Sequence, residues 1–196
     1  MDTEIHVVAD IGGTNARFAY TAGDDRQPRG VEIFPCADFN YLIEAIQRYI
    51  DNNLISPPDS VCLAVAGPVE EDWIDLPNNH WAFSQRETAT QLGTKLHVIN
   101  DFSAQVLSID ALPDSQLHWY GPNRPAGSGV RAVIGPGTGL GVSAMLPSGA
   151  ILPSEGGHVA FAPVDDHEVA LLKVLRERFP RVSVDRVLSG PGLANL

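Results

Sequence analysis

The run Asp10-Ile11-Gly12-Gly13-Thr14-Asn15 constrains the fold of this chain more than any other segment, because of the residues on either side of it. An apolar stretch, Val7-Val8-Ala9, precedes it, and residues 16–20 alternate like a half-buried strand. The glycines therefore predict a β-hairpin. Dinucleotide-binding and Walker phosphate loops need a helix directly after their glycines, so this segment does not match either motif.

A hairpin of this kind has two interpretations. Its glycines let the backbone approach an anion closely and Thr14 adds a hydroxyl donor, so the turn can hold phosphate. Asp10 is then placed to hold a cation beside the phosphates. The alternative is a tight hairpin that needs glycine only for its turn conformation.

Composition excludes several classes of partner. The 196 residues carry 13 basic and 24 acidic side chains, a net charge of −11, which disfavours nucleic acid and anionic membrane surfaces. Cys36 and Cys62 have no metal-ligand spacing and are expected as reduced thiols. With no leader and no apolar run of spanning length, the sequence predicts a cytoplasmic protein without a membrane partner.

The predicted elements alternate between strands and helices. A polar turn is expected at 24–30, and residues 113–129 are interpreted as a boundary or exposed connection. The expected strands are 5–11, 15–21, 31–35, 61–66 and 96–99, the last two buried, and then 131–134 and 142–145 around a second glycine turn at 135–141. Three helices are expected: one after Asp38 with apolar positions at 39–50, one after Ser84 that ends before Gly93, and one over 102–112 after Asn100-Asp101. A fourth helix is capped by Asp165 or Asp166 and ended by Pro180, and residues 193–196 form the first turn of another helix.

Three further groups carry candidate chemistry. Asp101 follows a buried strand, where a carboxylate can accept a proton from a substrate hydroxyl; the alternative is that it only caps the next helix, which would lower its pKa. The glycines of Glu155-Gly156-Gly157-His158 let the carboxylate and imidazole point into one space and bind adjacent hydroxyls of a polyol. Asn78 can add an amide, and Trp81 is expected in the core or as a cleft wall.

Together these segments resemble bacterial glucokinases of the hexokinase type, within the actin, Hsp70 and sugar-kinase superfamily. The resemblance runs from about Val7 to Leu196. It rests on six ordered blocks: Asp10–Arg17, Asn79–Ser84, Ile99–Phe102, Gly137–Gly141, Glu155–Val159 and Arg186–Gly192.

The resemblance implies an α/β, two-lobed actin-like ATPase (ribonuclease H-like) fold with mixed sheets and an incomplete second lobe. The small N-terminal lobe would be 1–112, and 113–196 the first part of the large lobe. It also implies transfer of the γ-phosphate of ATP to the 6-hydroxyl of glucose, with Mg²⁺, in a homodimer. By position, Asp101 is the catalytic base, and Asp10 stays the metal ligand predicted above from its place beside the glycine turn. The implied sugar-binding residues are Asn100, Glu155 and His158, with Asp185 at a further sugar-binding position, and the predicted substrate contacts also include Asp101 and the Asn78 amide described above. The implied phosphate segments are Ala9, Asp10, Ile11, Gly12, Gly13 and Thr14, and Gly137, Thr138 and Gly139.

Two departures from the family pattern affect this interpretation. The family usually holds a sugar-binding Glu where this chain has Asp185, which is one methylene shorter. The family also continues past Leu196, so a longer gene product is expected, and weak or absent kinase activity if the chain stops there. The alternatives are a kinase for another hexose and a non-catalytic sugar-binding fragment; ATP, ADP and polyphosphate stay open as donors. A related repressor and sugar-kinase family is disfavoured, because its cysteine-rich zinc segment has no counterpart in residues 159–196.

Overall fold

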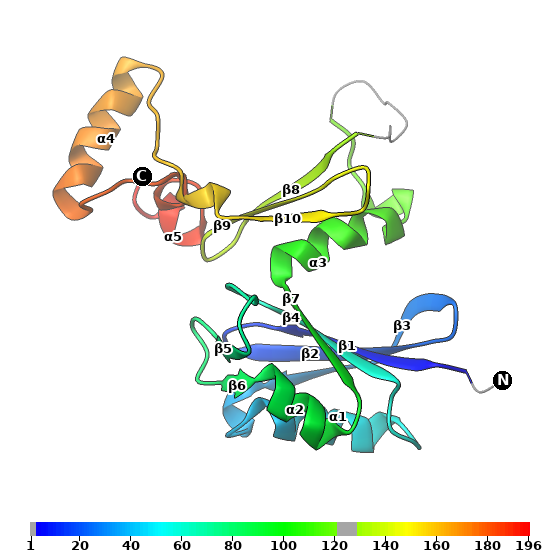
Figure 1. Ribbon diagram of the computed structural model, residues 1–196. Coiled ribbons are helices and arrows are strands. Elements are labelled where there is room, and N and C mark those ends of the chain that lie inside the picture. Colours follow the sequence, from blue (N-terminus) through cyan, green and yellow to red (C-terminus); the bar gives the residue numbers. More distant parts are fainter. Residues whose placement is uncertain (1–2, 121–128) are drawn as a thin grey trace. The chain divides into compact units, whose positions relative to one another are not determined.

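A computed structural model describes residues 3–120 and 129–196, and the chain divides into two compact units, Met1–Ala104 and Gln105–Leu196 (Figure 1). The predicted lobe boundary, after residue 112, lies a little further along the chain. Of the predicted connection at 113–129, residues 121–128 lie outside the described part. None of the helices in the described residues is long and apolar enough to cross a membrane.

The first unit is built on a five-stranded mixed sheet with the order β3-β2-β1-β4-β7. Strand β1 pairs antiparallel with β2 and parallel with β4, and β4 pairs parallel with β7. The strands are β1 (Ile5–Ile11), β2 (Asn15–Ala22), β3 (Asp25–Pro35), β4 (Ser60–Val65) and β7 (Lys95–Asn100).

Two helices, α1 (Leu42–Asn53) and α2 (Gln85–Leu92), lie on one side of this sheet (Figure 1). The core between these helices and the sheet is apolar, and its largest fully buried side chains are Trp81, Tyr49, Phe18, Ile46 and Leu63. The Tyr49 hydroxyl donates to the Gly30 carbonyl at 2.9 Å, and burial raises the Tyr49 pKa to about 12. The apolar face predicted for residues 39–50 is therefore core, as expected.

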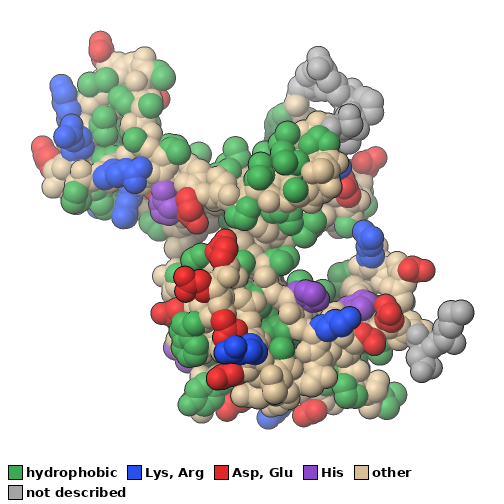
Figure 2. All heavy atoms as spheres, viewed as in Figure 1, with side chains coloured by type: hydrophobic (Ala, Val, Ile, Leu, Met, Phe, Trp, Pro, Cys, Tyr) green, Lys and Arg blue, Asp and Glu red, His purple; other side chains and the backbone are tan. Residues whose placement is uncertain are grey.

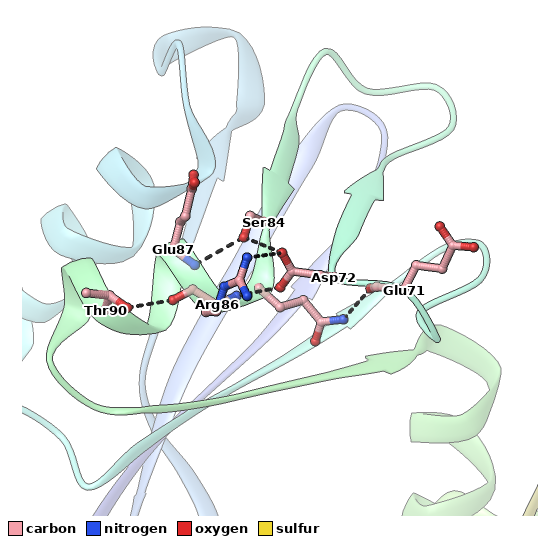
Figure 3. A network of polar contacts seen from close by, with 7 residues as sticks. Glu71, Asp72, Ser84, Arg86, Glu87 and Thr90 are labelled. Atoms are coloured by element: carbon pink, nitrogen blue, oxygen red, sulfur yellow. Dashed lines mark hydrogen bonds and ion pairs between the residues drawn. The ribbon is translucent and has the colours of Figure 1, made fainter.

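A short hairpin, β5 (Trp73–Asp75) and β6 (Ala82–Ser84), leads into α2. Ser84 caps α2, because its Oγ accepts from the Glu87 N–H at 3.1 Å and donates to the Asp72 carboxylate at 2.7 Å (Figure 3). Gly93 follows α2 in the left-handed region, with φ of +66°. Both ends of this helix are confirmed as the sequence predicts them.

The second unit contains a three-stranded antiparallel sheet with the order β10-β9-β8. Asp165 caps α4 by accepting from the Glu168 N–H at 2.8 Å, as one of the two predicted capping residues. Figure 2 shows Lys and Arg side chains gathered over the region of α4. The elements of this unit are β8 (Arg131–Pro136), β9 (Leu140–Met145), β10 (Ile151–Ser154), η4 (Gly156–His158), α4 (Asp166–Arg178), η5 (Val184–Arg186) and α5 (Gly190–Leu193), with η2 (Ile109–Ala111) and η3 (Asp114–Gln116) before them.

Several boundaries differ from the prediction. The turn expected at 24–30 is mostly strand, because β3 is an edge strand and tolerates Pro28. Helix α1 begins at Leu42 instead of after Asp38, since residues 36–38 form the 3₁₀ turn η1 and Glu44 accepts from the N–H groups of Asn40 and Tyr41. The helix predicted over 102–112 is α3 (Asp101–Ser108) followed by η2. The helical turn expected at 193–196 is α5, which ends at Leu193.

The burial predicted for two strands is also corrected. In β4, Val61, Leu63 and Val65 are fully buried, whereas the alternate side chains are only half-buried. Strand β7 lies at the edge of the sheet and its side chains are half-buried or exposed. Continuous apolar sequence indicated burial on both faces, but the helices α1 and α2 cover one face of this sheet.

Candidate active site

The first glycine turn joins β1 to β2 as the predicted hairpin, closed by the Gly12 N–H donating to the Asn15 carbonyl at 3.0 Å. Neither Gly12 nor Gly13 has a positive φ. A Cβ at Gly13 would instead lie 2.7 Å from the backbone oxygen of Asn78. A positive φ therefore does not explain these glycines, whereas a close backbone approach requires Gly13, and the phosphate-binding interpretation stays a prediction.

Two side chains that the sequence analysis missed hold this turn in place. The Asn79 amide Nδ2 donates to the Gly12 carbonyl at 2.9 Å, and the Cys36 Sγ lies 3.6 Å from the same oxygen. The Cys36 N–H also donates to the Thr14 carbonyl at 2.8 Å. Both residues act on backbone atoms, so the sequence does not reveal this role, although Asn79 begins one of the six blocks that carry the family resemblance.

Asp10, the proposed metal ligand, lies at the end of β1 and is exposed. Its Oδ2 is 3.0 Å from the Arg17 Nη1. Among the described residues there is no group of three or more His, Cys, Asp or Glu side chains able to enclose a metal. Mg²⁺ needs no such cage, because it binds through one or two carboxylates together with substrate phosphates and water, and Asp10 beside Asp101 fits that requirement.

Asn100 and Asp101 mark the change from β7 to α3. The Asn100 Oδ1 accepts from the Phe102 and Ser103 N–H groups at 3.0 and 3.2 Å, and its Nδ2 donates to the Gly67 carbonyl at 3.3 Å. Asn100 thus satisfies the first turn of α3, and Asp101 is the first residue of the helix. The Asp101 Oδ1 also accepts from the Phe102 N–H at 2.9 Å, so this carboxylate contacts the helix terminus as well, and its role as a base stays a prediction.

The environment of Asp101 raises its pKa above the ordinary value of 3.8. Burial of the carboxyl is the largest cause, and the negative charge of nearby Asp10 adds to it, while the Phe102 N–H acts in the opposite direction. The lowered pKa expected for a capping residue is therefore wrong, because desolvation outweighs the helix terminus. A raised pKa makes this carboxylate a better proton acceptor.

Asn78 and Trp81 lie in the loop between β5 and β6. Asn78 is exposed and has a φ of +65°, which an Asn tolerates better than most residues. Trp81 is 1% exposed and its Nε1 donates to the Phe39 carbonyl at 3.1 Å, so it belongs to the core, one of the two positions expected.

The second glycine turn connects β8 to β9 in the other unit. The Gly137 N–H donates to the Gly139 carbonyl at 2.8 Å, and the Gly137 carbonyl accepts from the Gly190 N–H at 2.8 Å. A Cβ at Gly137 or Gly139 would meet no atom within 4 Å. Packing within the described residues does not require these glycines, which leaves the space around the turn open to a ligand.

Glu155, His158 and Asp185 form one cluster in the second unit. The His158 Nε2 lies 3.5 Å from the Glu155 Oε2, and its Nδ1 lies 3.6 Å from the Asp185 Oδ2. Asp185 is 15% exposed, and its other oxygen accepts from the Ser183 hydroxyl. Asp185 is thus held by protein groups, whereas Glu155 is 77% exposed and free to bind a ligand hydroxyl.

The predicted site residues therefore form two sets, one in each unit. In the first unit, Ala9 to Thr14, Asn78 and Asp101 lie around the ends of β1 and β7, and the Asn100 side chain is used by backbone groups. In the second unit, Gly157 lets η4 pack directly against β9, because a Cβ at this position would collide with the Leu140 carbonyl oxygen. This contact presses η4, which ends in His158, onto β9 beside the second turn.

An apolar groove of about 340 Å³ lies on the β1-β2-β3 part of the first unit. Asp10 and Arg17 contribute its charged side chains, and Val8 and Val31 are among its apolar ones. Most of its surface is apolar, so the groove itself does not resemble a phosphate site. Asp10 borders it at the carboxyl end of β1.

The chain is similar to known proteins both in sequence and in structure. A family model described as Glucokinase matches residues 7–196. A glucokinase from Hahella chejuensis is 42% identical over 97% of this chain and 60% of its own length. The crystal structure of a glucokinase from an Antarctic psychrotroph is 38% identical, with a TM-score of 0.87, and the match covers 98% of this chain and 62% of that chain. The crystal structure of a Balamuthia mandrillaris glucokinase in complex with glucose is 26% identical, with a TM-score of 0.75, and the match covers 98% of this chain and 61% of that chain.

The chain spans about 60% of the length of the relatives it matches. The likeness confirms the predicted fold class, an α/β actin-like ATPase fold with mixed sheets. The family match covers both glycine turns and the segments of both candidate clusters, and on these grounds the chain belongs to the glucokinase family.

Proposed function

We propose that the protein containing this chain is an ATP-dependent glucokinase, which transfers the γ-phosphate of ATP to the 6-hydroxyl of glucose. The observation that carries the proposal is the half-buried Asp101 carboxylate at the end of β7, with a raised pKa, beside Asp10 and the first glycine turn. The glucose bound in the Balamuthia mandrillaris structure supports the choice of sugar.

Each glycine turn would serve the phosphates. The first turn offers Gly13 and Thr14 N–H groups and the Thr14 hydroxyl, and the second offers backbone around Gly137 and Gly139 where nothing fills the space. Such concave turns bind anions through oriented N–H dipoles, which suits a chain with a net charge of −11. The whole set of proposed phosphate residues is Ala9–Thr14 and Gly137–Gly139.

Asp101 would accept the proton of the sugar hydroxyl as that oxygen attacks the γ-phosphorus. Phosphoryl transfer depends mainly on positioning and charge stabilisation, so a fixed carboxylate with a raised pKa is what the protein has to provide. Asp10, with Asp101 beside it, would hold Mg²⁺, which neutralises phosphate charge when bound. Arg17 would keep the Asp10 carboxylate oriented.

The proposed sugar-binding residues are Glu155 and His158 in the second unit and Asn78, Asn100 and Asp101 in the first unit. Asp185 would act through His158, because its carboxylate is already held by Ser183 and faces the imidazole. We also propose lobes at 1–112 and 113–196, a homodimer, and a cytoplasmic location; the family membership and the acidic composition support these points.

The proposal is tested by coupling glucose 6-phosphate formation to a dehydrogenase, with wild-type protein, Asp101→Asn and the control Asp51→Asn on the exposed side of α1. We expect turnover with glucose and ATP, a loss of about 10²–10⁴-fold in Asp101→Asn, and wild-type rates in the control. Unchanged turnover in Asp101→Asn would remove the base assignment. Glucose binding measured by calorimetry without any turnover would favour the non-catalytic sugar-binding alternative. A higher rate with another hexose than with glucose would favour a kinase for that hexose.

A further inference from the structure

The orientation of one peptide group in the first glycine turn depends on a side chain from another loop. We propose that Asn79 is a positioning residue, which fixes the Gly12–Gly13 peptide so that the Gly13 N–H faces the phosphate of a bound nucleotide. The inference rests on the proposed function for its ligand, and on the geometry of residues 12–14 and 76–81 for its mechanism.

The Gly12 carbonyl is turned into the protein. Its oxygen accepts from the Asn79 Nδ2 at 2.9 Å and lies 3.6 Å from the Cys36 Sγ, so both of its lone pairs face protein groups. In a trans peptide the C=O and the following N–H point in opposite directions, and the structure has no cis peptide bond among its described residues. Holding the carbonyl inward therefore turns the Gly13 N–H outward.

The outward N–H is available to a ligand. Within the described part of the chain, no group accepts a hydrogen bond from the Gly13 N–H, whereas the Gly12 N–H is used by Asn15. On the other side of Gly13, the Asn78 backbone oxygen leaves no room for a Cβ. The residue is thus confined between the 76–81 loop and the open side of the turn.

Asn79 itself is held in one orientation. Its Oδ1 accepts from the Trp81 N–H at 3.1 Å, so the Nδ2 end has to face Gly12. The Trp81 ring is buried and its Nε1 donates to the Phe39 carbonyl, which also contacts the His80 Nε2 at 2.9 Å. The side chain that orients the peptide is therefore itself anchored to the core of the first unit.

Two substitutions separate this role from a simple charge effect. Asn79→Ala removes the donor without adding charge, and Asn79→Asp places an acceptor against the Gly12 carbonyl. We expect about tenfold weaker nucleotide binding in Asn79→Ala, the size of one lost hydrogen bond. Asn79→Asp should be weaker still, because two oxygens would then face each other.

The experiment measures ATP and glucose affinities by calorimetry for wild-type protein, both variants and the control Asn40→Ala, an exposed residue of the same unit. The inference requires weaker ATP binding in Asn79→Ala, a glucose affinity within twofold of wild type, and a control that matches wild type for both. If Asn79→Ala binds ATP within twofold of wild type, the inference is overturned. This also holds when only Asn79→Asp binds ATP weakly, because that pattern indicates charge repulsion. Should Asn79→Ala fail to fold, Asn79→Ser, whose hydroxyl is too short to replace the amide at Gly12, takes its place.

A second measurement keeps this inference distinct from the proposed function. In ¹⁵N-labelled protein without ligand, Asn79→Ala should shift the Gly13 and Thr14 amide resonances, while those of β7 stay in place. Unchanged Gly13 and Thr14 resonances would overturn the orientation whatever the binding results. Shifted resonances in a protein whose wild type binds no ATP would support the orientation and overturn the proposed function instead.

Discussion

Gly157 offers the sharpest test of how the second unit is packed. A Cβ at this position would lie 1.9 Å from the Leu140 carbonyl oxygen and 2.8 Å from its carbonyl carbon, whereas real Cβ contacts are essentially never below 3.0 Å. Gly157→Ala must therefore separate η4 from β9 by about 1 Å, which is the difference between 3.0 and 1.9 Å. The obstructing atoms are backbone atoms of a paired strand, so no side chain can rotate away.

We expect a loss of about 3 kcal/mol, the upper end of the cost of overpacking, because the strand itself has to move. For a unit of this size that corresponds to a fall of roughly 12–24 °C in melting temperature. Urea unfolding followed by circular dichroism measures the change. Gly139→Ala is the matched control, since a Cβ there meets nothing within 4 Å, and it should stay within about 0.5 kcal/mol of wild type. Equal stability of the two variants would refute the packing argument.

Three further predictions concern the first unit. Burial raises the pKa of Asp101, so the folded protein binds that proton more tightly than the unfolded chain does. The free energy of unfolding should therefore fall as pH rises from 3.8 through the raised pKa. Asp101→Asn should remove this fall, and urea unfolding at a series of pH values measures it. Ser84→Ala should cost about 1 kcal/mol in the same assay, since the cap of α2 and the bond to Asp72 are lost together, and a cost near zero would contradict the cap. Tyr49→Phe should lose about 1 kcal/mol with the bond to Gly30, and the ultraviolet titration step near pH 12 should disappear with it.

Local chemistry explains which parts of the fold the sequence predicts well. The hairpin around Gly12, the cap at Ser84 and the left-handed Gly93 each depend on residues close together in the chain. The first half of β3, which contains Pro28, was predicted as a turn because the tolerance of proline depends on β3 being at the edge of the sheet, whereas residues 31–35 were predicted as a strand. Burial of β7 was overestimated for the same reason, since an edge position is a tertiary property.

The candidate site also contains some residues whose role the sequence indicates and others whose role depends on the fold. Carboxylates and imidazoles such as Asp101 and His158 are visible in the sequence, because their chemistry suggests a role. The contacts of Asn79 and Ser183 are not, since these residues bind a carbonyl and a carboxylate that only the folded chain brings to them. The lowered pKa that the capping alternative implied for Asp101 was wrong for a related reason: position in the sequence indicates a helix terminus, whereas desolvation depends on packing.

The Asn78 oxygen beside Gly13 makes two distant positions depend on each other in any directed evolution of this protein. A side chain can enter position 13 only when the loop that contains residue 78 has changed first, by shortening or by a different backbone path. A library that varies position 13 alone should return glycine, whereas paired variation of 13 and 76–80 should yield alternatives. This epistasis arises from a backbone atom, so no exchange of the residue 78 side chain by itself relieves it.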